Sequence, residues 1–355
     1  MSKHWKDAAS IIICSRTSFY SHNNSCQTNK FPNPNYSAPK PLDYKILTLK
    51  RSIKSSFMPE TYVFPGGKVD EADLSMKWMD LFKEIGIGDL IKTWASKNKE
   101  FGNSLFQNPA KYEIPKLLSL RITAIRETFE ECGLLLCKRK NTFNKDDSNW
   151  ASYLSGHEIL QWQRRVQKDP SEFFNLCKHF ECYPDVLALQ AWRVWLTPTH
   201  RMQRFNTAFF LTTLDQRPPT IVDELEATEV RWDTSEKLLE LSQSGRISVP
   251  IPQIYELTKI KNFRTINSLM EFASNKNNES CAVWMSIHKK CDEGIVAILP
   301  GDDTYPENPD FTAVVPVERI NGSFEGLRRA CHRLNRMENY DGNKWEVVVN
   351  IDSGI

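Results

Sequence analysis

The stretch RETFEECG, residues Arg126–Gly133, places one arginine and three glutamates within six residues and ends at a glycine. Successive helical residues are rotated by about 100°, which puts Glu127, Glu130 and Glu131 in one arc. Like charges spaced i, i+3 and i+4 repel by about 0.2–0.5 kcal/mol per exposed pair. A divalent cation would relieve this repulsion, but an acidic face turned to solvent would give the same pattern. The octet alone leaves both interpretations open.

The opposite face of the same segment is apolar. Proline suits the first turn of a helix and glycine the position after the last turn, so the pattern predicts a helix from Pro115 to Cys132, followed by Gly133. The residues expected to dock this helix on a core are Leu118, Ile122, Ile125, Phe129 and Cys132.

A second signal lies upstream, in FPGGKVDEAD, Phe64–Asp73. An extended segment over residues 61–64 runs into Pro65, and two glycines then allow the backbone to turn tightly or to approach a ligand closely. Together with RETFEECG, this stretch resembles the box of the nudix hydrolases: a glycine, five residues, an acid, seven residues, then Arg-Glu-U-x-Glu-Glu-x-Gly-U, where U is apolar. Gly67 matches the glycine. Asp73 stands where the family usually has glutamate, and Thr128 departs at the first U.

The spacing between the two halves of the box differs from the family pattern. Arg126 follows Gly67 by 59 positions rather than 14, so 45 residues are inserted. The motif 19-type nudix hydrolases carry such an insertion inside their box. The chain resembles this subgroup in further segments as well, which follow in the same order from about Trp5 to Tyr305. The resemblance implies an α+β fold, an α/β/α sandwich with a mixed sheet flanked by helices. We expect a nudix domain over residues 5–265, with a helical insertion (74–118) and a loop (17–43), and a C-terminal extension (266–355) with a small β unit.

The resemblance also implies a metal site and roles for its residues. Glu127, Glu130, Glu131 and the Gly67 carbonyl would ligate Mg²⁺ or Mn²⁺, which prefer oxygen ligands. Arg126 would orient a glutamate, Glu127 would ligate a metal or help to deprotonate water, and Asp73 would support the ligands from behind. A further acid from a distant loop often acts as base; Glu226 and Glu224 are candidates by position, and a solvated acidic loop would explain them as well.

The implied substrate is coenzyme A or acyl-coenzyme A, cleaved to 3′,5′-ADP and 4′-phosphopantetheine or its acyl form. Lys50, Arg51 and Lys54 precede the box and are the predicted phosphate contacts. Other coenzyme A nudix enzymes continue from Arg-Ser with Leu-Arg-x-His-x-Gly, but here Ser55, Ser56, Met58 and Glu60 stand at those positions. ADP-ribose, a dinucleotide, a capped RNA, or a binding module without catalysis are the alternatives.

Composition sets the remaining expectations. The net charge of +2 is small for 355 residues and argues against a general nucleic-acid binder. No apolar run approaches the ~20 residues that span a bilayer. Family members are peroxisomal or mitochondrial, yet the chain ends in SGI rather than Ser-Lys-Leu. Nine cysteines are expected to be reduced and structural. The cluster CKHFEC lacks a second Cys-x-x-Cys pair for a four-ligand zinc site.

The remaining segments predict further elements. Residues 8–15 and 45–49 are expected to be strands of a long hairpin, and residues 142–184 to be mostly helical. Strands are expected over 186–197 and 205–214 and from Glu229, followed by an amphipathic helix to Leu241. The C-terminal β unit is expected over 281–298 and 312–317. Aromatic residues of the insertion can line a pocket, although core packing is the more common role: Trp78, Trp94, Phe101 and Phe106.

Overall fold

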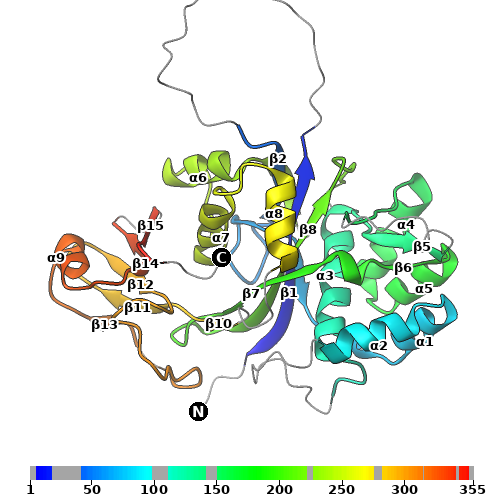
Figure 1. The fold of residues 1–355 in the computed structure, drawn as a ribbon, viewed down its shortest axis with the longest axis horizontal. Coiled ribbons are helices and arrows are strands. Elements are labelled where there is room, and N and C mark those ends of the chain that lie inside the picture. Colours follow the sequence, from blue (N-terminus) through cyan, green and yellow to red (C-terminus); the bar gives the residue numbers. More distant parts are fainter. Residues whose placement is uncertain are drawn as a thin grey trace, which may run out of the picture.

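The computed structural model describes residues 5–17, 41–97, 111–140, 150–221, 227–275, 282–314, 316–340 and 344–351. Its central element is a mixed sheet with helices on both faces and a smaller sheet at one side (Figure 1). This arrangement confirms the predicted α+β sandwich. Glu226, Phe101, Phe106 and most of the predicted loop over 17–43 lie outside the described residues.

The main sheet has eight strands within the described part of the chain. Six of them follow the order β10-β7-β8-β1-β2-β3, while β4 pairs with β1 and β9 with β2. The central strand β1 runs parallel to β8 and antiparallel to β2 and β4. The strands are β1 (Lys6–Arg16), β2 (Tyr44–Arg51), β3 (Tyr62–Val63), β4 (Gly66–Lys68), β7 (Gln190–Leu196), β8 (Phe205–Leu214), β9 (Ala227–Asp233) and β10 (Val283–Trp284).

Alternation along β1 separates two apolar layers, because successive side chains of a strand point to opposite faces. Ile11 and Ile13 pack with the layer that contains α3, whereas Ile12 and Cys14 pack with the helices on the other face. The first layer is built by α1 (Lys77–Glu84), α2 (Gly88–Lys97), α3 (Lys116–Cys132), α4 (His157–Lys168) and α5 (Glu172–His179). The second is built by α6 (Ser235–Gln243), α7 (Ile251–Ile260) and α8 (Ile266–Asn275).

The chain after β10 forms a second sheet, of five strands in the described residues, in the order β13-β11-β12-β14-β15. One face has its own small core around Phe324, while Ala297 and Met337 pack into the layer of α6 to α8. Tyr255 on α7 donates a hydrogen bond to Asn335 Oδ1 at 3.1 Å. The C-terminal unit is therefore docked on the main domain. Its elements are β11 (Ile287–Lys290), β12 (Ile295–Ile298), β13 (Glu318–Arg319), α9 (Phe324–Arg329), β14 (Asn335–Asn339) and β15 (Trp345–Val349).

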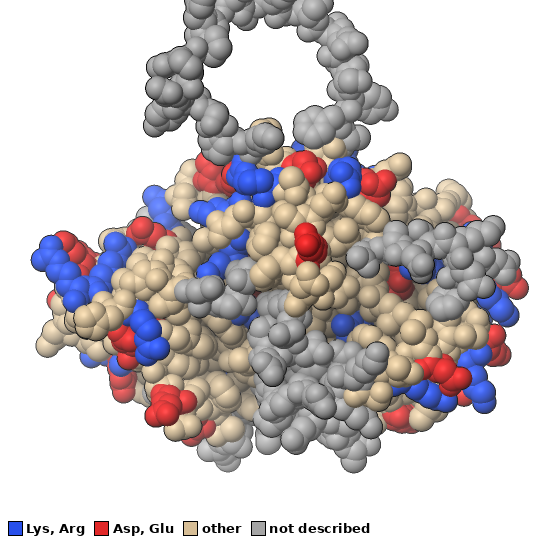
Figure 2. All heavy atoms as spheres, in the orientation of Figure 1, with Lys and Arg blue, Asp and Glu red and all other residues tan. Residues whose placement is uncertain are grey.

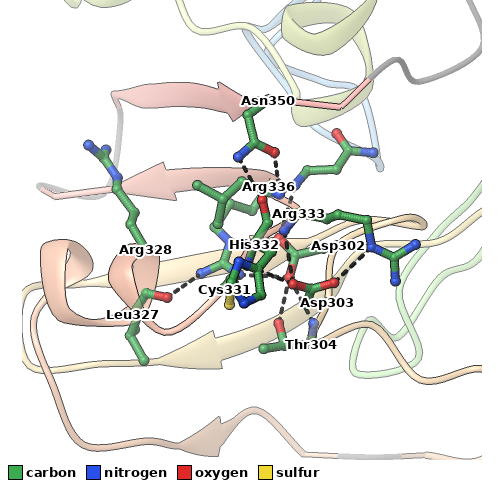
Figure 3. A network of polar contacts seen from close by, with 12 residues as sticks. Asp302, Asp303, Thr304, Leu327, Arg328, Cys331, His332, Arg333, Arg336 and Asn350 are labelled. Carbon is green, nitrogen blue, oxygen red and sulfur yellow. Dashed lines mark hydrogen bonds and ion pairs between the residues drawn. The ribbon is translucent and has the colours of Figure 1, made fainter.

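A buried ion pair fixes the turn that connects β12 to the rest of this unit (Figure 3). Arg336 donates from Nε and Nη2 to the two carboxylate oxygens of Asp302, both at 2.7 Å. The neighbouring Asp303 accepts hydrogen bonds from the backbone N–H groups of His332 and Arg333. Charged, bidentate hydrogen bonds of this kind are stronger than neutral ones, so these contacts hold together segments about 30 residues apart.

Three sequence expectations need correction. Cys182–Pro184 is not helical but forms strand β6, paired with β5 (Cys137–Arg139), because the chain turns back after α5. Val186–Ala188 is a short 3₁₀ helix, so the predicted strand begins at Gln190. In the C-terminal unit, Val283–Trp284 extends the main sheet and Glu318–Arg319 replaces the strand predicted over 312–317.

The surface agrees with the small net charge. On the face shown in Figure 2, basic and acidic side chains are interspersed. Among the residues that the structure describes, no helix combines the length and the apolarity needed to cross a membrane.

Candidate active site on helix α3

Helix α3 is buried on nearly all sides, which overturns its interpretation as a solvated acidic helix. The predicted docking residues are fully buried, and so are Glu130 and Glu131, each with 5% of its surface exposed. Only the Glu127 carboxylate, with 15% of the side chain exposed, reaches toward solvent. Thr128 fits this environment because its hydroxyl donates to the Ala124 carbonyl at 2.7 Å. The buried carboxylates therefore need partners inside the protein.

Arg126 supplies one of these partners and is itself clamped by Asp73. Its Nε and Nη2 donate to the two oxygens of Asp73 at 2.8 and 2.9 Å, and Nη1 donates to Glu130 Oε1 at 2.6 Å. Burial by itself lowers the pKa of Arg126, but Asp73, Glu127 and Glu130 outweigh burial and raise the pKa well above its usual range. Asp73 also accepts from Thr123. Asp73 was predicted to support the metal ligands without binding the cation itself. In the structure it binds Arg126, the arginine that orients Glu130.

The two glycines of the box lie on β4, against the carboxylates of α3. The Gly66 N–H donates to Glu131 Oε2 at 2.9 Å. A Cβ atom on Gly67 would stand 2.2 Å from Glu127 Oε2, and one on Gly66, where φ is +146°, would stand 2.2 Å from the Ala9 carbonyl oxygen. The contact with the β1 backbone requires glycine at position 66, whereas Gly67 leaves room for the Glu127 carboxylate.

Two amides from α4 hold the end of α3, and they were not among the predicted site residues. Gln163 and Gln167 each donate from Nε2 to the backbone carbonyl of Glu130, at 2.9 and 2.8 Å. Gly133 ends the helix in a left-handed conformation, with φ of 69°. Carbonyls in the last turn of a helix lack intrahelical partners, so these amides satisfy one of them. The i, i+4 spacing of the glutamines on an amphipathic helix was the available signal.

The donor set at this site fits a hard divalent cation. The Glu127 carboxylate faces Gly67, Glu131 accepts from the Gly66 N–H, and Arg126 contacts Glu127 and Glu130 at 3.0 and 2.6 Å. The oxygens of the three carboxylates do not all lie within 4.8 Å of one another, so sharing one cation would require their side chains to move closer. A carboxylate has about four lone-pair positions on its two oxygens, so one carboxylate can accept a hydrogen bond and also ligate a cation. All the donors are oxygens, as Mg²⁺ and Mn²⁺ require. The roles assigned to these residues stay predictions.

The predicted phosphate contacts are placed differently from one another. Arg51 lines a cavity beside the box, although its guanidinium donates to Ser55 and to the Phe57 carbonyl. Lys50 lies 3.7 Å from Glu60 Oε1, and Lys54 is exposed and outside that cavity's lining. Of the three, only Arg51 therefore borders the cavity.

The cavity, of about 960 Å³, begins at the box and extends to the C-terminal unit. It is bordered by Gly66, Gly67 and Lys68 of β4, by strands β1, β7 and β8, and by residues 248–253 at the start of α7. Several wall residues were not predicted from the sequence because they lie far apart in the chain: Phe57, Met58, Trp195, His200, Arg201, Phe205, Ser286, His288 and Trp345. Its aromatic and basic lining suits a ligand with both apolar and anionic parts.

The aromatic residues of the insertion that the structure describes pack in the core. Trp78 is buried against Phe173 and Phe174, with ring centroids 5.6 and 5.3 Å apart. Trp94 stacks on the guanidinium of Arg121, which lies 4.3 Å from the ring centroid. Trp78 and Trp94 therefore have the more common of the two predicted roles, core packing.

The sandwich, the helix with its buried glutamates and the glycine strand opposite them define a nudix fold. A solved structure of a nudix hydrolase from Alicyclobacillus acidocaldarius matches the fold with a TM-score of 0.51, at 19% identity, over 76% of this chain and 96% of that one.

Comparison with models of protein families shows which family of nudix hydrolases the chain resembles. Residues 5–260 match the model described as NUDT19 Nudix domain, and residues 288–350 match NUDT19 C-terminal domain. A Xenopus laevis protein named acyl-coenzyme A diphosphatase NUDT19 is 38% identical over 98% of this chain and 93% of its own length. The Homo sapiens protein of that name is 31% identical over 98% and 92%. The chain belongs to the NUDT19 family of nudix hydrolases.

Proposed function

We propose that the chain is a Mg²⁺- or Mn²⁺-dependent diphosphatase that hydrolyses the P–O–P bond of coenzyme A and acyl-coenzyme A. The products would be 3′,5′-ADP and 4′-phosphopantetheine or its acyl form. Relatives of nearly the same length carry the name acyl-coenzyme A diphosphatase. The observation that supports the proposal most is the cavity, because it joins the box glycines to the C-terminal unit that this family shares.

The walls of the cavity suit the parts of such a substrate. Ligand pockets commonly measure about 300–1,000 Å³, and 960 Å³ is at the upper end. Arg51, Lys68 and Arg201 supply positive charge at the wall, as a polyanionic ligand requires. The edge-to-face pair of Phe57 and Phe205, with centroids 4.9 Å apart, offers an apolar surface for an adenine or an acyl chain.

The residues of the box would divide the chemistry among them. A bound divalent cation supplies positive charge where the phosphate oxygens crowd in the transition state. Glu130 and Glu131 would hold it, each fixed by its own hydrogen bond, to Arg126 and to the Gly66 N–H. Glu127, the exposed member of the three, would ligate a cation or accept the proton of the attacking water. Glu226 remains a second candidate for that proton.

A substrate panel with product identification tests the proposal. The purified chain is incubated with Mg²⁺ or Mn²⁺ and with coenzyme A, an acyl-coenzyme A, ADP-ribose, a dinucleotide or a capped RNA, and the products are identified by mass spectrometry. We expect 3′,5′-ADP from the first two at the highest kcat/KM. Faster turnover of another compound would show that coenzyme A is not the preferred substrate and would identify that compound as the better one. Intact compounds throughout, with no divalent-metal binding by calorimetry, would indicate a binding module without catalysis.

A further inference from the structure

Three cysteines outside the box converge on one point behind α3. Cys137 lies on β5, Cys177 in the last turn of α5, and Cys182 on β6. Their sulfur atoms all lie within 4.8 Å of one another, and all three residues are fully buried. Sequence spacing could not reveal the group, because Cys137 is 40 residues from its nearest partner and lies outside the CKHFEC cluster.

The local backbone is shaped to bring these sulfurs together. Strands β5 and β6 pair antiparallel, with Arg139 opposite Cys182 and Cys137 opposite Pro184. Between α5 and β6, Glu181 takes a left-handed conformation with φ of 48°. Such a conformation is unfavourable for a residue other than glycine, so the surrounding contacts enforce this turn. It returns the chain so that Cys182 faces Cys177.

We propose that Cys137, Cys177 and Cys182 form a binding site for one soft, thiophilic cation, Cu⁺ or Zn²⁺. Thiolate ligands select these ions over Mg²⁺ and Mn²⁺. Zn–S bonds of about 2.3 Å in tetrahedral geometry place the sulfurs roughly 3.8 Å apart, which the observed separations reach with small side-chain shifts. Within the described residues the group contains three sulfurs, since His179 turns away to Glu158 at 2.9 Å.

The pKa values of the three thiols differ from one another. Hydrogen bonds from the Cys137 and Cys177 thiols lower the pKa of Cys182 to about 5, with a further contribution from Arg139. Burial raises the pKa of Cys137 and of Cys177 well above the usual range of a thiol. A cation binds the thiolate form of each cysteine, so binding would release to the buffer the protons that the three sulfurs carry.

The site would tie together the support of α3. Cys137 lies six residues after Glu131, and α5 packs against α4, whose glutamines hold the Glu130 carbonyl. A cation bridging β5, β6 and α5 would stiffen this support. This consequence does not depend on which substrate the box cleaves.

Metal retention by the full chain tests the proposal. Reduced, metal-stripped protein receives Cu⁺ or Zn²⁺ in separate arms, with excess Mg²⁺ to occupy carboxylate sites, followed by gel filtration with a competing chelator and elemental analysis. We expect one equivalent of one of the two ions to be retained. Cys182→Ser should lower the affinity at least about tenfold, whereas Cys291→Ser, at a buried cysteine of the C-terminal unit, should retain it.

A measurement on the unaltered chain covers the case in which Cys182→Ser fails to fold. X-ray absorption of the loaded wild-type protein should show sulfur neighbours at about 2.3 Å. A shell of oxygen and nitrogen alone would refute the site. So would the loss of both metals to the chelator, or a disulfide within the trio whose reduction restores no metal binding.

Discussion

At the scale of single residues, the two adjacent glycines of the box, Gly66 and Gly67, have different roles. Gly66 passes so close to β1 that a side chain would overlap the Ala9 backbone, at a φ that favours glycine. Gly67 faces only the flexible end of Glu127. One glycine therefore serves the fold and the other serves the site. A methyl group added at Gly66 should therefore affect stability, and one added at Gly67 should affect activity.

Gly67→Ala should impair hydrolysis with little change in stability. The new methyl displaces the Glu127 carboxylate, and a misplacement of about 1 Å can reduce turnover roughly 10²-fold. Gly66→Ala, the matched control, should instead lower the free energy of unfolding by more than about 1 kcal/mol. Urea unfolding and steady-state kinetics on both variants measure the two effects. Full turnover in folded Gly67→Ala would contradict the assignment.

At the scale of elements, α3 is positioned by structures that the sequence places far away. Two contacts lie at the C-terminal end of the helix: β4 donates from the Gly66 N–H to Glu131, and α4 donates from two glutamine amides to the Glu130 carbonyl. The helix and its docking face were predictable because local periodicity determines them. The glutamine contacts were not, because they depend on how α4 packs. Likewise, the motif expected after Arg51 is missing, yet Phe57 and Met58 of that loop still line the cavity.

The double variant Gln163→Ala/Gln167→Ala should loosen the end of α3. Each lost hydrogen bond contributes about 1 kcal/mol, and more where the buried carbonyl is left without a partner. We expect a lower unfolding midpoint and a weaker divalent-metal affinity, measured by urea titration and calorimetry. Gln161→Ala changes an exposed residue of the same helix and should leave both values unchanged. Equal effects from the two variants would show that the contact to Glu130 is immaterial.

At the scale of the whole molecule, the C-terminal unit completes the cavity and depends on buried polar contacts. Trp345 and His288 line the cavity from this unit, while the Asp302–Arg336 pair holds its turns. The sequence indicated a small β unit but not its strand order, because pairs such as Asp302 and Arg336 are 34 residues apart. Long-range contacts of this kind leave no local periodicity. The cavity, like the cysteine group, appears only once the chain is folded.

Acid should loosen the C-terminal unit before the rest of the molecule. Burial, with His200 and Arg201, lowers the pKa of His288 to about 3, against about 6.5 in the unfolded chain. The unfolded state thus binds the extra proton between these values, and stability falls as pH drops below about 6.5. Hydrogen bonds from the Arg333 backbone and side chain lower the pKa of Asp303 to about 2, so its contribution is lost between about pH 4 and 2.

Hydrogen exchange of β14 and β15 across this pH range measures the effect. His288→Gln should flatten the loss of protection between about pH 6.5 and 4, because glutamine does not titrate. An unchanged pH profile in that variant would exclude His288 as its origin.

The most direct test of the active site compares wild type with Glu130→Gln on coenzyme A. Glutamine keeps the shape of Glu130 and can still accept from Arg126, but it removes a charge that would hold the cation. With saturating coenzyme A and Mg²⁺ or Mn²⁺, mass spectrometry should detect 3′,5′-ADP from wild type and from Glu240→Gln, an exposed control on α6. The rate in Glu130→Gln should be at least about tenfold lower. Wild-type release of 3′,5′-ADP by folded Glu130→Gln would contradict a nudix mechanism at this helix.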